Sequence, residues 1–171
     1  MTVTRVAFAA TALLLASIAA AAPPAFTGTA VSVHDGDTLH VIDDAKQEHT
    51  IRLAGIDAPE RRQPFGTVAR DRLAELAKGN AVAVIAGKPD KYGRTVARIE
   101  VEGHDVGHLL VAEGLAWHYT RYSDDASIAE AERAARAARR GLWRDPAPVP
   151  PWEWRATEKE RKAAKRQPAG R

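Results

Sequence analysis

The chain contains no cysteine among its 171 residues and only one methionine. Without a thiol, no disulfide can support the fold, and no thiolate can attack a substrate or bind a metal. Any metal site must therefore use oxygen or imidazole ligands. The six histidines lack the H-E-x-x-H spacing of a common zinc motif, so we expect them to be surface residues.

Long uncharged apolar runs are also lacking, with one exception at the amino terminus. Arg5 supplies a positive charge, residues 6–18 carry no charge, and residues 19–21 are three alanines. The run is alanine-rich and falls short of the ~20 strongly apolar residues that span a bilayer. This pattern predicts a signal peptide over residues 1–21, cleaved near Ala21, and export to the periplasm or the medium. An uncleaved membrane anchor is the alternative.

Neither sign of charge dominates the central part of the chain. Residues 22–152 carry 17 basic and 19 acidic side chains, whereas residues 153–171 carry seven basic and three acidic ones. The length after cleavage fits one domain, which we place at residues 22–143. Residues 144–171 are expected to form a proline-rich strap and a basic tail, and the part beyond Trp154 is either a charged helix or disordered. Trp152 and Trp154 are expected to pin the strap.

Alternating β-branched residues and turn signals predict a mainly β domain with helices interspersed. Asp35-Gly36 favours a hairpin, and helical spacing of apolar residues marks the helical segments. The expected strands are residues 26–33, 38–42, 49–56, 81–86 and 95–101. The expected helices are residues 67–77, 106–112 and 126–140.

Three short stretches combine carboxylates with arginines. They are residues 34–38 (HDGDT), 51–60 (IRLAGIDAPE) and 90–94 (DKYGR). Carboxylates hold a hard divalent cation, and guanidinium groups neutralise the charge of a phosphoryl group. Together they supply what hydrolysis of a phosphodiester requires. A module that only binds nucleic acid would need the arginines alone.

These motifs, with residues 113–116 (EGLA) and 141–143 (GLW), resemble the staphylococcal nuclease (thermonuclease) family. The resemblance covers about residues 27–143. It implies an α+β, mainly β fold, a five-stranded OB-fold barrel with about three helices, a class that often binds oligonucleotides. It also implies calcium-dependent cleavage of DNA and RNA.

The resemblance assigns calcium binding to Asp37, Asp57 and the backbone carbonyl of Ala58. Residue types alone allow Mg²⁺ or Mn²⁺ as well. It assigns activation of the attacking water to Glu60, and binding of the phosphate and stabilisation of the transition state to Arg52 and Arg94. Asp35, which precedes a glycine in a hairpin, is expected to bind the backbone of its own turn.

The resemblance also places four residues beside the bound nucleotide. Lys91 and Tyr92 flank it, and Tyr122 keeps the register of a substrate-binding tyrosine. Tyr119 is offset by one residue and is either a site residue or a core residue. Residues 63–66 (QPFG) replace a longer basic loop of the family's best-studied member, which weakens the expectation of tight DNA binding.

Two other classes of protein are compatible with parts of this pattern. A catalytically inactive OB-fold module would bind nucleic acid, but it would be expected to lack some of the acidic or arginine positions, and all of them are filled. An exported interaction domain would leave the convergent carboxylates unexplained. The sequence therefore favours an exported nuclease, acting on DNA and RNA with single strands preferred. We expect a monomer, because there is no heptad seam or long apolar edge.

Overall fold

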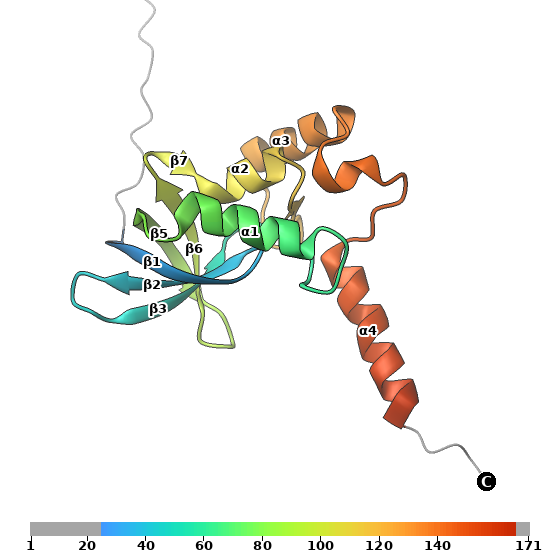
Figure 1. Ribbon diagram of the computed structural model, residues 1–171, viewed down its shortest axis with the longest axis horizontal. Helices are drawn as coiled ribbons and strands as arrows, with labels where there is room; N and C mark the ends of the chain where they lie inside the picture. Colours follow the sequence, from blue (N-terminus) through green and yellow to red (C-terminus); the bar gives the residue numbers. More distant parts are fainter. Residues whose placement is uncertain (1–24, 167–171) are drawn as a thin grey trace, which may run out of the picture.

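A closed β-barrel forms the body of the protein in the computed structural model, which describes residues 25–166 (Figure 1). Its long strands are β1 (Phe26–Asp35), β2 (Thr38–Asp43), β3 (Glu48–Leu53), β5 (Ala81–Pro89) and β6 (Thr95–Val101). Their order is β3-β2-β1-β5-β6, and a parallel pairing of β3 with β6 closes the barrel. Closure leaves no free edge between these strands. The expected five-stranded OB-type barrel is confirmed, and the expected signal peptide lies outside the described residues.

The barrel interior is filled by the alternate side chains of the strands. Leu39, Val41, Ile51, Val84 and Ile99 are all fully buried. Because successive side chains of a strand point to opposite faces, the residues between these are free to face outward. This alternation explains why the sequence pattern located the long strands.

Helices cover one side and one end of the barrel (Figure 1). They are α1 (Gly66–Ala77), α2 (Val106–Ala112), α3 (Ala126–Ala137), α4 (Pro151–Arg166) and a short 3-10 helix, η1 (Gly141–Arg144). α1 buries Ala69, Leu73 and Ala77. Asp125 caps α3 by accepting hydrogen bonds from the backbone of Ser127 and Ile128.

Two expected elements end earlier than the sequence predicted. The strand expected over residues 49–56 is interrupted by a turn at Ala54 and Gly55, where Gly55 has a φ of 73°. The chain then forms a separate short strand, β4 (Ile56–Asp57), which pairs with β8 (Trp117–His118). The helix expected to reach residue 140 ends at Ala137, and Arg139 adopts a φ of 51°. Both breaks are places where the backbone is left-handed, which ends regular structure.

The proline-rich strap leads into a helix. Residues 145–150 have no regular structure, and of the two alternatives considered for the tail, the helical one is observed, as α4. Trp152 stacks on Tyr119 with ring centroids 5.3 Å apart, and its edge lies against Trp117. Gln63 Nε2 donates a hydrogen bond of 2.6 Å to the carbonyl of Val149. These contacts fix the start of α4 on the body.

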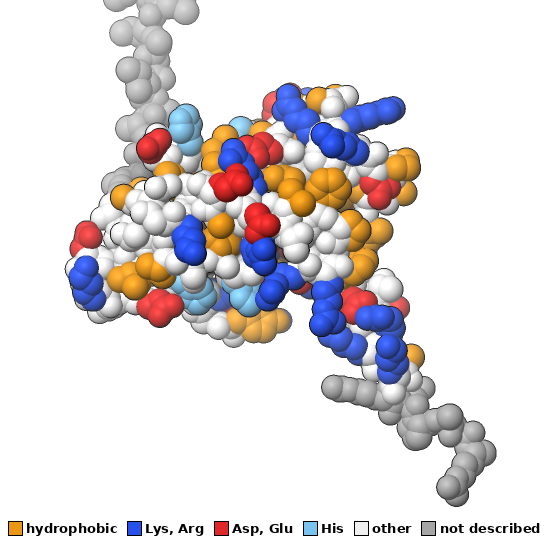
Figure 2. All heavy atoms as spheres, viewed as in Figure 1, with side chains coloured by type: hydrophobic (Ala, Val, Ile, Leu, Met, Phe, Trp, Pro, Cys, Tyr) orange, Lys and Arg blue, Asp and Glu red, His pale blue; other side chains and the backbone are white. Residues whose placement is uncertain are grey.

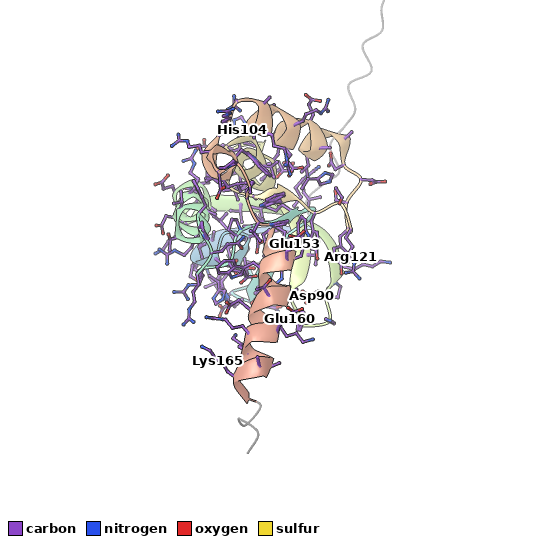
Figure 3. All side chains as sticks on the ribbon, turned by 90° about the vertical axis from the view of Figure 1, so that its right-hand side faces the viewer. Asp90, His104, Arg121, Glu153, Glu160 and Lys165 are labelled. Carbon is purple, nitrogen blue, oxygen red and sulfur yellow. The ribbon has the colours of Figure 1, made fainter. Side chains whose placement is uncertain are left out.

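Beyond its first turns, α4 projects away from the barrel (Figures 1 and 3). Another short strand, β7 (His104–Asp105), extends the sheet beside β6. Among residues 25–166, no helix has the length and apolar character needed to cross a membrane.

Candidate active site

Asp37, Arg52 and Asp57 meet at one end of the barrel. Asp37 lies in the β1–β2 turn, where its backbone N–H donates to Asp35 Oδ1, so Asp35 has the turn role expected of it. Arg52 lies in β3 opposite Thr38 of β2. Asp57 lies in β4, the strand that follows the Gly55 turn. The hairpin and this turn therefore bring the three side chains together.

The guanidinium of Arg52 contacts both carboxylates. Its Nη1 lies 2.5 Å from Asp37 Oδ2, and its Nη2 donates to Asp57 Oδ1 at 2.8 Å. Asp57 is fully buried, and only 5% of Asp37 is exposed. Asp37 Oδ2 also accepts a 2.7 Å hydrogen bond from the backbone N–H of Ala58. Arg52 thus bridges the two buried carboxylates, a role that the planar, forked guanidinium is suited to fill.

Burial raises the pKa of Asp37 to about 7, against the lowering effect of Arg52. The negative charges of Asp35 and Asp57 raise it further, and the hydrogen bond from Ala58 lowers it. Asp37 is therefore harder to ionise than an exposed aspartate, chiefly because it is buried. An additional positive charge near Asp37 would favour its ionised form.

This pKa predicts an unusual dependence of stability on pH in the presence of chelator. Asp37 ionises near its ordinary value of 3.8 in the unfolded chain but near 7 in the folded protein. Between these values the folded state binds more protons, so the free energy of unfolding should fall by up to a few kcal/mol as pH rises from about 4 to 7, and then level off. Urea unfolding at a series of pH values measures this change.

The matched variant is Asp37→Asn, which keeps the size of the side chain and removes its titration. Its free energy of unfolding should lack this decline. A decline of the same size in both proteins would contradict the assignment to Asp37.

The residues present fit a divalent cation. Asp37 and Asp57 offer hard oxygen atoms around a common point, where both contact Arg52. Within residues 25–166, no cluster of three or more histidine, aspartate or glutamate side chains is placed to hold a metal. A cation here would therefore need further oxygen ligands from backbone, water or substrate. The carbonyl of Ala58, adjacent to Asp57 in the chain, was the ligand predicted from the sequence.

Glu60 lies beside this cluster and is held by Arg155, a residue of α4. Arg155 Nη1 donates to Glu60 Oε1 at 2.8 Å, and its Nη2 donates to Asp57 Oδ2 at 2.7 Å. A third contact joins Arg155 Nη1 to Asp57 Oδ1 at 3.2 Å. Burial lowers the pKa of Arg155, but its hydrogen bonds to Asp57 and Glu60 outweigh that effect and raise it. Asp57 is thus enclosed by two arginines.

Sequence reasoning missed Arg155, because it placed the basic tail after the domain of residues 22–143 and assigned no site residue to it. Arg155 is separated from Asp57 by 98 positions. The only signal that could have located it was the pair of tryptophans after the prolines, which were expected to pin the strap. A pinned strap places the next turn of the chain close to the carboxylates.

Glycine at position 66 lets the Glu60 loop close on α1. A Cβ added to Gly66 would lie 1.9 Å from the carbonyl oxygen of Glu60. The loop is further held by the backbone N–H of Glu60, which donates to Gln63 Oε1. Glu60 is therefore set in place by a tight turn, although its side chain is 39% exposed.

Arg94 is not part of the Asp37–Arg52–Asp57 cluster. Its guanidinium is bound by Asp90 of the same loop, with Nη2 2.6 Å and Nε 2.8 Å from Oδ2. These hydrogen bonds lower the pKa of Asp90 against the opposing effect of burial. Arg94 precedes Val96, the residue paired with Arg52, by two positions. The loop therefore ends close to β3, the strand that carries Arg52.

The expected nucleotide-binding residues fall into two groups. Tyr92 and Tyr122 are 72% and 70% exposed, and Lys91 Nζ lies 5.1 Å from the centre of the Tyr92 ring. The ring of Tyr119 instead stacks on Trp152 and contacts Tyr122 edge-on. One face of the Tyr119 ring therefore packs against Trp152, as expected if Tyr119 is a core residue.

One expectation about the histidines is wrong. His118 is buried, with Nε2 3.2 Å from Ser123 Oγ, because β8 is paired with β4 under α3 and the following loop. His104 and His108 are spaced four residues apart, but they belong to no cluster of metal-binding side chains within residues 25–166.

Comparison with known proteins agrees with this fold. Residues 50–145 match the family described as staphylococcal nuclease homologue. An uncharacterized endonuclease of Escherichia coli O157:H7 is 40% identical over 129 residues, which cover 75% of this chain and 84% of that protein. A micrococcal nuclease of Shigella flexneri is 39% identical over 164 residues, covering 90% and 92%.

A staphylococcal-like nuclease of Arabidopsis thaliana is 41% identical over 109 residues, 64% of this chain and 34% of the plant protein. The chain belongs to the staphylococcal nuclease family. The resemblance found in the motifs is thereby confirmed.

Proposed function

We propose that this protein is a metal-dependent nuclease that hydrolyses phosphodiester bonds of DNA and RNA. The observation that carries the proposal is the pair of buried carboxylates, Asp37 and Asp57, around Arg52, with Glu60 beside them. Relatives named endonuclease and micrococcal nuclease support the same class of activity. Each position that this chemistry requires carries the expected carboxylate or arginine.

Glu60 is the residue proposed to take a proton from the attacking water. The water oxygen then forms a bond to phosphorus, the ester P–O bond breaks, and the departing oxygen takes up a proton. Arg52 donates to the phosphoryl oxygens, where negative charge grows in the transition state. A cation held by Asp37 and Asp57 would supply Lewis-acid stabilisation of the same charge.

Arg155 and Arg94 would each have to change partners when a cation and a phosphate bind. Because both oxygens of Asp57 accept hydrogen bonds from arginines, a cation at Asp57 competes with those contacts. Arg94 would have to exchange Asp90 for a phosphate oxygen before it could assist Arg52. Arg52 is therefore the main cationic residue of the proposed mechanism.

Calcium is the cation we propose. Two carboxylates leave most of the coordination to backbone, water and substrate oxygens, and Ca²⁺ accepts six to eight such ligands in flexible geometry. Mg²⁺ needs nearly ideal octahedral geometry, which makes it the weaker candidate for a site that arginines partly occupy.

Single-stranded nucleic acid is the proposed substrate form. The exposed rings of Tyr92 and Tyr122 offer surfaces on which unpaired bases can stack, and Lys91 and Arg94 lie at the face of Tyr92. Paired bases would not be available for such contacts. We propose that the protein acts as a monomer.

We also propose that the protein is exported, on the basis of Arg5, the uncharged run that follows it and the alanines before residue 22. Amino-terminal sequencing of the protein recovered outside the cytoplasm should begin near Ala22. A start at residue 1 in the membrane fraction would instead indicate the anchor.

Purified mature protein should degrade labelled single-stranded DNA and RNA with calcium and lose this activity in chelator. Substitution of magnesium or manganese for calcium identifies the preferred ion. Binding of the oligonucleotide without cleavage in any of these ions would indicate the inactive OB-fold module. Double-stranded substrates of the same sequence should be cleaved more slowly.

A further inference from the structure

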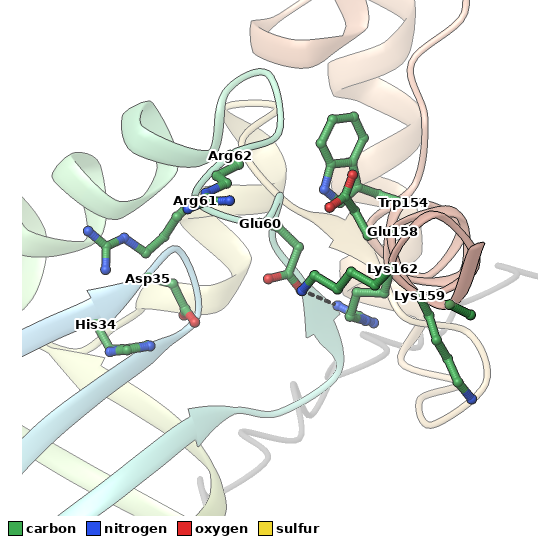
Figure 4. Close-up of a pocket in the computed structure, with 11 residues that line it drawn as sticks. His34, Asp35, Glu60, Arg61, Arg62, Trp154, Glu158, Lys159 and Lys162 are labelled. Carbon is green, nitrogen blue, oxygen red and sulfur yellow. Dashed lines mark hydrogen bonds and ion pairs between the residues drawn. The ribbon is translucent and has the colours of Figure 1, made fainter. Parts of the chain in front are cut away.

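A groove of about 910 Å³ lies between α4 and the barrel and opens beside Glu60 (Figure 4). We propose that this groove binds the polynucleotide strand that continues from the phosphate being cleaved, with its basic side chains contacting successive phosphates. This inference rests on the proposed nuclease function and extends it to residues outside the reaction centre.

The two walls of the groove come from distant parts of the chain. One wall carries Asp35 at the end of β1 and Glu60 and Arg61 in the loop after β4. The opposite wall is one face of α4, where Arg155, Lys159 and Lys162 recur at spacings of four and three residues. Residues at such spacings lie on the same side of a helix. The α4 wall of the groove therefore carries three basic side chains and one acidic one, Glu158, and it starts at the carboxylates.

The groove carries an excess of positive charge. Five basic side chains line it, Arg61, Arg62, Arg155, Lys159 and Lys162, against three acidic ones, Asp35, Glu60 and Glu158.

Two of these acidic side chains are already paired. Glu60 pairs with Arg155, and Glu158 pairs at 2.8 Å with Arg161, which does not line the groove. Of the ion pairs formed within residues 25–166, none uses Arg61, Arg62, Lys159 or Lys162. Four positive charges thus remain for a polyanion.

The position of α4 follows from the contacts of its first turns and not from Lys159 and Lys162. Trp152 stacks on Tyr119, and Arg155 reaches Asp57 and Glu60, so the first turn is fixed to the body. Lys159 and Lys162 are exposed, and the helix beyond them stands away from the barrel. Figure 2 shows basic side chains gathered along this projecting helix. Their charge is not needed for packing.

The contacts of Trp152 and Arg155 also set the direction in which a bound polynucleotide strand would run. Arg155 lies at the carboxylates, and Lys162 lies seven residues further along α4, or about 10 Å at the rise of an α-helix. A strand whose phosphate is at Arg52 and Glu60 can therefore follow α4 outward and meet Lys159 and then Lys162. Contacts to phosphates alone give affinity without sequence preference.

The test compares two double variants. Lys159→Ser/Lys162→Ser removes two charges from the groove, and Lys78→Ser/Lys165→Ser removes two charges from exposed residues that do not line it and that take part in none of the ion pairs formed within residues 25–166. Lys165 is labelled near the end of α4 in Figure 3. All four side chains are exposed, so both variants should unfold at the temperature of the parent protein. Fluorescence anisotropy with a single-stranded oligonucleotide of about 12 nucleotides, in chelator, measures binding without cleavage.

We expect the slope of log K against log salt to become shallower by about 1.4 in the groove variant, because each phosphate contact on a single strand contributes about 0.7. The control variant should keep the parent slope. In the cleavage assay, the groove variant should raise KM for the polymer while kcat stays unchanged, since the reacting groups are intact.

Equal changes of slope in the two variants, or no change in either, would overturn the groove proposal even if the protein cleaves nucleic acid. A shallower slope in the groove variant alone supports the groove, including in a protein that cleaves nothing with any metal. That last result would contradict the nuclease function and leave the binding groove standing.

Discussion

Replacement of Glu60 by glutamine should lower kcat by roughly 10² to 10⁴ while binding of oligonucleotide in chelator changes little. Glutamine keeps the shape of the side chain and can still accept a hydrogen bond from Arg155, but it cannot take a proton from water. The side chain is 39% exposed, so the fold should be unaffected. Single-turnover cleavage with saturating protein measures the chemical step directly.

The control is Glu153→Gln, an exposed acidic residue in the first turn of α4 that does not line the groove. It removes the same charge and should retain the parent kcat. If Glu60→Gln cleaved as fast as Glu153→Gln, Glu60 would not be the base, and another group would have to activate the water.

Replacement of Arg52 by methionine should reduce both stability and activity. Arg52 is the residue that contacts Asp37 and Asp57 together, and its side chain is only 13% exposed. Removing one partner of a buried ionic group leaves uncompensated charge, which typically costs about 3–5 kcal/mol of the free energy of unfolding. Loss of a donor to the phosphoryl oxygens should lower kcat by a further ~10² to 10³. Urea unfolding in chelator gives the first quantity and single-turnover cleavage the second.

The matched control is Arg133→Met, an arginine on α3 that is 70% exposed and pairs with Glu130. Pairs of this kind contribute ~0–1 kcal/mol, so its stability should stay close to that of the parent. Arg52→Lys should not restore full activity, because a single ammonium cannot contact both carboxylates as a planar guanidinium does.

Calcium should separate the two roles of Arg52. If the cation binds at Asp37 and Asp57, it replaces the lost positive charge, so adding calcium should stabilise Arg52→Met more than the parent protein. Activity should remain low, because the donor to the phosphate is still missing. An equal effect of calcium on both proteins would indicate that the cation binds elsewhere.

Much of the barrel could be predicted from local sequence. The strands β1, β2, β5 and β6 were located by alternating β-branched residues, and α1 by apolar residues at helical spacing, because both patterns reflect which side chains the core must bury. The break at Gly55 was missed. Its reason is tertiary, since β4 forms only by pairing with β8, about 60 positions later in the chain.

The candidate site was predicted in part for a similar reason. Asp37 and Asp57 were expected at one mouth of the barrel from their positions after a turn and a strand, and both do contact Arg52. Arg94 was expected to reach the same phosphate, but Asp90, four residues before it, holds its guanidinium. Local pairing within a loop is not visible in a motif that lists only the residue types.

By itself, the sequence determined the family, the barrel and the meeting of Asp37, Arg52 and Asp57, because motif and alternation are local properties of the chain. Only the tertiary structure decided that the basic tail belongs to the site. Trp152 stacks on Tyr119, and Arg155 inserts between Asp57 and Glu60, residues that precede it by nearly a hundred positions. Such contacts depend on how the surfaces of folded elements fit together, and no pattern of neighbouring residues encodes them.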